Sequence, residues 1–79
     1  MKITQKLLTK QLEHVNQFVL ENSVYRIRMN RAYGYYNLYL HYSYEPTKTI
    51  RLLYVGDARE TNAFLTALQM RHWYMQEPF

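Results

Sequence analysis

The segments Tyr25–Met29 (YRIRM) and Tyr35–Tyr42 (YYNLYLHY) decide the fold of this 79-residue chain. In both segments apolar and polar side chains alternate with a period of two, which is typical of a half-buried strand. The four residues from Arg31 to Gly34 predict a turn, because Gly34 can adopt a positive φ. The two segments therefore predict an antiparallel hairpin with strands at residues 24–30 and 35–44.

The polarity of the two strands matches if Asn30 pairs with Tyr35. This register sets Ile27 opposite Leu38 on an apolar face. A slip by one residue would move every side chain of one strand to the other face and destroy the match. We therefore predict this register, and we expect one shared set of residues to face the core: Tyr25, Ile27, Met29, Tyr36, Leu38, Leu40 and Tyr42.

A third strand is predicted at residues 49–55, after a turn at residues 45–48 in which Pro46 presets φ. Its two faces are almost equally apolar, since Ile50, Leu52 and Tyr54 alternate with Arg51, Leu53 and Val55. We favour the first set in the core, because Arg51 then joins the other arginines. The opposite register fits nearly as well, and a strand that is apolar on both faces also suits a position covered on both sides.

An amphipathic helix is predicted over residues 3–22, where apolar residues recur at spacings of three and four. Thr4 is the expected N-cap, and Ile3 before it can pack against Leu8. Asn22 tolerates the left-handed conformation that ends a helix. The apolar stripe is expected to cover the sheet, because a coiled coil would need more heptads than this segment holds.

A second helix is predicted from about Ala58 to Met75. Gly56 ends the preceding strand, and Asp57 and Glu60 have the spacing of a capping box. Pro78 cannot continue the helix. Its main apolar stripe comprises Phe64, Leu65, Leu68 and Met75.

The order helix–strand–strand–strand–helix predicts an α+β fold, in one domain over residues 1–79. The expected architecture is a three-stranded antiparallel meander with both helices packed on one face, because this arrangement buries one core. The predicted core comprises Leu8, Leu12, Val15, Val19, Ile27, Leu38, Leu40, Leu52, Phe64, Leu65 and Leu68.

Composition excludes several classes of protein. The chain has no cysteine, so disulfides and thiolate metal sites are excluded. No apolar run approaches the roughly 20 residues of a membrane span, and the charged N-terminal segment is unlike a secretory signal, so we expect a cytoplasmic protein without a membrane partner. The net charge of +4 permits nucleic acid or an acidic protein as partner but requires neither.

The hairpin and the second helix resemble a loose group of small bacteriophage and mobile-element proteins. The resemblance rests on Tyr25-x-Ile27-x-Met29, on residues 32–38 (AYGYYNL) and on residues 58–65 (ARETNAFL). Tyr35 stands where a second glycine is common in that group. The resemblance implies a mobile-element source and a helix–hairpin–helix fold, and it transfers no functional residues.

The sequence contains no recognisable catalytic constellation. His14, His41 and His72 lie on three different predicted elements, and the chain has only two glycines, too few for a phosphate-binding loop. Helix capping explains Asp57 and Glu60. We therefore expect no enzymatic activity, no cofactor, no metal site and no small-molecule substrate.

The polar face of the predicted sheet is the candidate binding surface. Tyrosine and arginine are enriched at protein–protein hot spots, and a bare tyrosine-rich face would be unusually apolar. We therefore expect a protein partner or a second copy of this chain. One alternative is a nucleic-acid accessory protein that uses the same side chains to contact phosphates and bases. The other is that these residues have no binding role, because tyrosine and arginine are ordinary on an exposed sheet face. The candidate residues are Arg26, Arg28, Tyr35, Asn37, Tyr39, His41 and Arg51.

Overall fold

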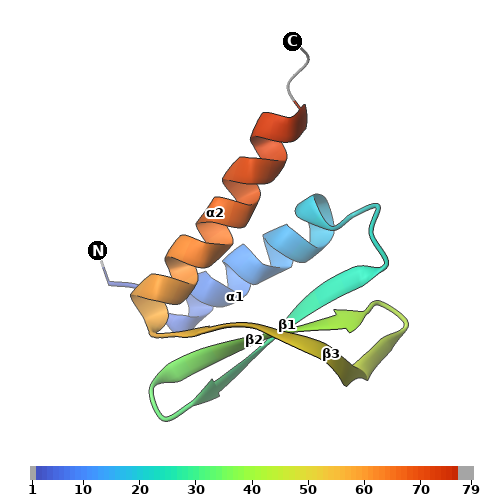
Figure 1. Ribbon diagram of the computed structural model, residues 1–79. Coiled ribbons are helices and arrows are strands. Elements are labelled where there is room, and N and C mark those ends of the chain that lie inside the picture. Colours follow the sequence, from blue (N-terminus) through green and yellow to red (C-terminus); the bar gives the residue numbers. More distant parts are fainter. Residues whose placement is uncertain (1, 77–79) are drawn as a thin grey trace.

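The computed structural model describes the backbone of residues 2–76 and the side chains of residues 2–71. Its elements are α1 (Gln5–His14), a π-helical turn η1 (Val15–Val19), β1 (Tyr25–Ala32), β2 (Tyr35–Tyr42), β3 (Glu45–Gly56) and α2 (Ala58–Gln76). The strands form one antiparallel sheet in the order β1-β2-β3, and both helices lie on one side of it (Figure 1). The predicted α+β fold is confirmed. The side chain of Met75 and the predicted helix stop at Pro78 lie outside the described residues.

The first helix begins where its cap predicts and ends earlier than expected. The backbone N–H of Leu7 donates to Thr4 Oγ1 over 3.2 Å, which confirms Thr4 as the N-cap. The helix then widens into η1, where Leu20 N donates to Val15 O, five residues before it, over 3.0 Å. Helical structure stops at Val19, three residues before the predicted end at Asn22.

The β1–β2 hairpin keeps the predicted faces but not the predicted register. Asn30 pairs with Asn37 rather than with Tyr35, so the pairing is shifted by two residues. A shift of two preserves the side on which every residue lies, so Ile27 and Leu38 still face the core. The turn contains only Tyr33 and Gly34, which both have positive φ, at 53° and 78°. This is the backbone of a type I′ turn, whose twist suits a two-residue hairpin.

The third strand changes faces part-way along its length. Tyr54 lies opposite Leu38 on the core side, but a bulge at Leu53 then sets Leu52 opposite Tyr39. The prediction that Leu52 and Ile50 are core residues is therefore wrong, and these side chains are 48% and 42% exposed. Neither of the two regular registers considered from the sequence describes the whole strand, because a bulge reverses the alternation.

The core lies between the sheet and the two helices. Leu8, Leu38 and Leu65, from α1, β2 and α2, have no exposed surface. Val15, Ile27 and Tyr36 complete the buried cluster, and the other predicted core residues except Leu52 pack around it. At the start of α2, Asp57 Oδ1 accepts from Glu60 N over 2.9 Å, and Glu60 Oε1 accepts from Asp57 N over 3.0 Å, so the capping box is confirmed.

Candidate functional site

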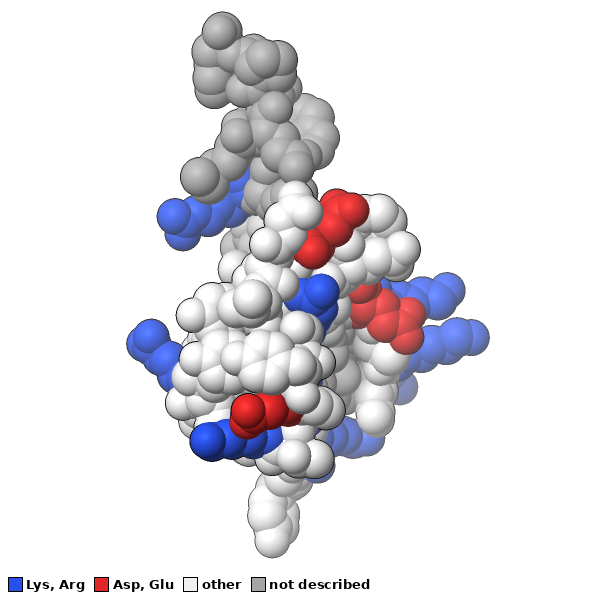
Figure 2. Space-filling view, turned by 90° about the vertical axis from the view of Figure 1, so that its right-hand side faces the viewer, with Lys and Arg blue, Asp and Glu red and all other residues white. Residues whose placement is uncertain are grey.

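The side of the sheet away from the helices, here called the outer face, carries six of the seven candidate residues. Their strand positions alternate with buried Ile27 and Leu38, which places the six on the opposite side. Arg51 differs, because it pairs with Leu40 and therefore lies on the helix side. Lysine and arginine side chains are spread around the end of the molecule in Figure 2 and do not form one patch. By strand position the six on the outer face are Arg26, Arg28, Tyr35, Asn37, Tyr39 and His41, although the side chain of Arg26 turns toward the segment after η1.

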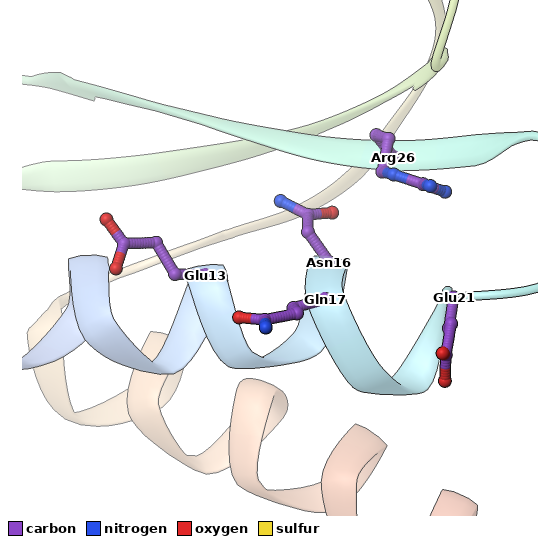
Figure 3. A pocket seen from close by; sticks show the side chains of 5 residues that line it. All are labelled: Glu13, Asn16, Gln17, Glu21 and Arg26. Carbon is purple, nitrogen blue, oxygen red and sulfur yellow. The ribbon is translucent and has the colours of Figure 1, made fainter.

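Arg26 is engaged by the backbone of its own chain. Its Nη1 donates to the carbonyl oxygens of Leu20 and Ser23, both over 2.8 Å, and to that of Tyr25 over 2.6 Å. Figure 3 shows the side chain extending from β1 toward the segment that follows η1. Leu20 is the C-cap of η1, so the guanidinium adds a second hydrogen bond to a carbonyl at the end of a helix, which also accepts from Ser23 N over 3.0 Å. We therefore assign Arg26 a structural role at this connection.

Arg28 and His41 are also engaged within the sheet. Arg28 Nη2 donates to Thr49 Oγ1 over 2.6 Å, so its side chain crosses β2 to reach β3. On the way its guanidinium carbon lies 4.8 Å from the ring centroid of Tyr39, which is a cation–π contact. His41 is only 8% exposed, and its Nδ1 donates to the carbonyl of Tyr42 over 2.7 Å. The polar side chains of the outer face are therefore less available to a ligand than the sequence suggests.

What the outer face does expose is an apolar stripe, defined by Tyr35, Tyr39, Leu52 and Val55. Tyr35 is 54% exposed, and Leu52 and Val55 are each 48% exposed. The pairs Asn37–Val55 and Tyr39–Leu52 join β2 and β3, so the stripe is continuous across two strands. The favoured register placed Val55 on this face but put Leu52 in the core; the signal that could have found Leu52 was that both faces of strand 49–55 are apolar.

One edge of the sheet is protected by a side chain from the first helix. Asn16 of η1 donates from Nδ2 to the carbonyl of Ile27 and accepts at Oδ1 from its N–H, both over 2.8 Å. At this one residue of β1, which is an edge strand, the amide takes the place of a neighbouring strand's backbone. This contact limits the pairing of another strand with the edge of β1 at this point.

A shallow hollow between η1 and β1 does not form a convincing ligand site. It is lined by Glu13, Asn16, Gln17, Glu21 and Arg26. In Figure 3 the carboxylates of Glu13 and Glu21 point away from Arg26 and from each other. Asn16 and Arg26 already have backbone partners. The polar groups therefore do not converge on one point, as a small-molecule site would require.

The residues that the structure describes contain neither a metal-binding cluster nor a membrane-spanning helix. Within that part of the chain, no three His, Asp or Glu side chains are grouped so that they could hold a metal ion. Neither described helix is both long enough and apolar enough to cross a membrane. His14, an isolated histidine of α1, packs against Phe18 with ring centroids 4.7 Å apart.

Three tyrosine rings form a second exposed feature, which we call the tyrosine row. Tyr25 stacks on Tyr42, and Tyr42 stacks on Tyr44. Tyr25 and Tyr42 are paired across β1 and β2, and Tyr44 lies in the β2–β3 turn. Sequence reasoning treated Tyr25 and Tyr42 only as core-facing residues and missed this row, because its contacts depend on the actual register.

Comparisons of the chain with protein-family models, with curated proteins and with solved structures found no match.

Proposed function

We propose that this chain is a non-enzymatic binding protein and that the outer face of its sheet contacts another protein. The partner that we infer first is a second copy of this chain. The observation that carries the proposal is the apolar stripe, a continuous and largely uncharged surface on two strands. Such a surface gains free energy when another protein covers it.

Charge also favours a protein over nucleic acid at this face. The guanidinium groups of Arg26 and Arg28 already bond to groups of the same chain. These bonds hold both side chains in place, so their guanidinium groups are less free to reach phosphates than those of unpaired arginines. Nucleic acid therefore remains the second candidate for the outer face. The resemblance to small mobile-element proteins fits a chain that acts by binding, and such a source is part of the proposal.

Association of two copies is supported by where the charges lie. The chain carries a net charge of +4, which makes two copies repel each other. The four residues of the apolar stripe carry no charge, and the nearest cation on this face, Arg28, is held by Thr49 and by the ring of Tyr39. A 79-residue domain also buries a limited core and gains stability from such an interface.

The test is the substitution Leu52→Lys, which places a charge in the middle of the apolar stripe. Light scattering after gel filtration should show dimers for the wild type and monomers for Leu52→Lys, because each interface would bury two unpaired charges. Leu52 is 48% exposed, so the monomer should remain folded.

Met70→Lys is the matched control, because Met70 is 53% exposed on α2 and lies outside the sheet. It should leave the dimer intact. A wild type that stays monomeric at high concentration would contradict self-association, and the outer face would then be left to a different protein.

A further inference from the structure

The tyrosine row lies at the end of the sheet opposite the Tyr33–Gly34 turn, where β1 begins and β2 ends (Figure 1). The ring centroids of Tyr25 and Tyr42 are 5.6 Å apart with planes at 22°, and those of Tyr42 and Tyr44 are 5.2 Å apart at 11°. The three rings are therefore nearly parallel and form a continuous offset stack.

The stack limits the kind of ligand that can bind. Centroid spacings of 5.2 and 5.6 Å leave no room for a group between the rings, so the row lacks the slots that hold proline-rich peptides. Only the two ends of the stack can be extended. Tyr44 forms one end and is 67% exposed, while Tyr42 supports one side of its ring. A flat, supported ring face of this kind suits another planar ring.

Positive charge lies close to the row. Arg51 pairs with Leu40, two residues from Tyr42 on the same side of β2, and its side chain is exposed. Lys48 is exposed in the irregular segment of β3 between Glu45 and Thr49. Figure 2 views this end of the molecule and shows lysine and arginine side chains toward both sides, with acidic side chains among them. An anionic ligand with planar rings therefore matches this end better than a neutral sugar.

We propose that the tyrosine row binds single-stranded nucleic acid, with an unpaired base stacked on the free face of Tyr44 and neighbouring phosphates near Arg51 and Lys48. Bases inside a duplex are already stacked on both sides and cannot extend the row. This site is separate from the proposed protein surface, because Tyr25, Tyr42 and Arg51 lie on the helix side of the sheet and Tyr44 lies in the turn after β2. Loss of dimerisation would leave this proposal untouched.

The test is fluorescence anisotropy with a short labelled oligouridine, a short labelled oligothymidine and a labelled duplex of the same length, at low salt. The wild type should bind the single strands more tightly than the duplex, and comparing the first two probes distinguishes RNA from DNA. Tyr44→Ala should weaken single-strand binding by about tenfold, the size expected for one lost stacking contact. Tyr44→Phe, which keeps the ring, should bind like the wild type.

Matched variants separate stacking from general effects. Tyr33→Ala removes a tyrosine that is 99% exposed in the other hairpin turn and should leave binding unchanged. Arg51→Ala should reduce the slope of log affinity against log salt by about 0.7, the value for one phosphate contact on a single strand. Circular dichroism checks that each variant is folded, and Tyr44→Leu provides a second variant of similar bulk without the ring.

Three results would each overturn the proposal. These are a wild type that binds no single strand at low salt, a folded Tyr44→Ala and Tyr44→Leu pair that bind like the wild type, and equal affinity for duplex and single strand.

Discussion

Single polar side chains in this protein bond to backbone groups where the first helical segment meets the first strand. Asn16 satisfies both backbone groups of Ile27 at the edge of β1, and Arg26 adds a hydrogen bond to the carbonyl of Leu20, which also accepts from Ser23 N. Both contacts join the helical segment that ends at η1 to the first strand. A backbone group that loses its partner in a partly buried position destabilises the fold, so these two side chains stabilise the connection.

We expect Asn16→Ala to lower the free energy of unfolding by about 1–3 kcal/mol, because the substitution removes two hydrogen bonds from a part-buried strand edge. Urea unfolding followed by circular dichroism measures the change. Gln17→Ala, on the next residue of η1, is the control and should have little effect, because Gln17 is exposed. Equal stability of Asn16→Ala and the wild type would show that water replaces the amide at no cost.

At the level of the elements, the two-residue turn sets the hairpin register. Tyr33 and Gly34 both adopt positive φ, and the strands pair from Ala32 and Tyr35 onward. A non-glycine residue in this region is unfavourable, and tyrosine lacks the short polar side chain that lets asparagine tolerate it. The side chain of Tyr33 is 99% exposed, so no packing offsets the strain.

Tyr33→Asn should therefore stabilise the protein, by about 0.5–1 kcal/mol, since Asn-Gly is the preferred pair in type I′ turns. Thermal unfolding should show a higher midpoint than the wild type. Gly34→Ala should have the opposite sign, because alanine is strained at a φ of 78° although its Cβ would have open space. A destabilised Tyr33→Asn would mean that Tyr33 makes contacts that its exposure does not reveal.

At the scale of the whole molecule, one face of the sheet is covered and the other is open. Leu38 points toward the helices and is completely buried, whereas Leu52 lies on the outer face and is 48% exposed. Two leucines on neighbouring strands thus have opposite environments. The bulge at Leu53 creates this difference, because it reverses the alternation of β3.

Leu38→Ala should lower the free energy of unfolding by about 2–5 kcal/mol, because it leaves a cavity where the helices meet the sheet. Leu52→Ala should change it far less, as expected at an exposed position. Both values come from urea unfolding at a protein concentration that keeps the chain monomeric. If the two substitutions were equally destabilising, β3 would have the regular register with Leu52 in the core.

The order of the elements, the two faces of the β1–β2 hairpin, the Thr4 cap and the Asp57–Glu60 capping box all follow from the sequence. Each depends on residues close together in the chain, where spacing alone determines the geometry. The two-residue shift between the strands was not predictable in this way, because registers that differ by two residues place the same side chains on the same faces.

Contacts between distant residues determined the rest. The bulge in β3 and the contact of Arg28 with Thr49 depend on segments that meet only in the folded chain. For this reason the arginines that the sequence presents as a free basic surface are engaged internally, while Leu52 and Val55 become exposed beside Tyr35 and Tyr39. A local pattern specifies which side of a strand a residue occupies, but only packing between elements decides whether that side is covered and whether a charge is already paired.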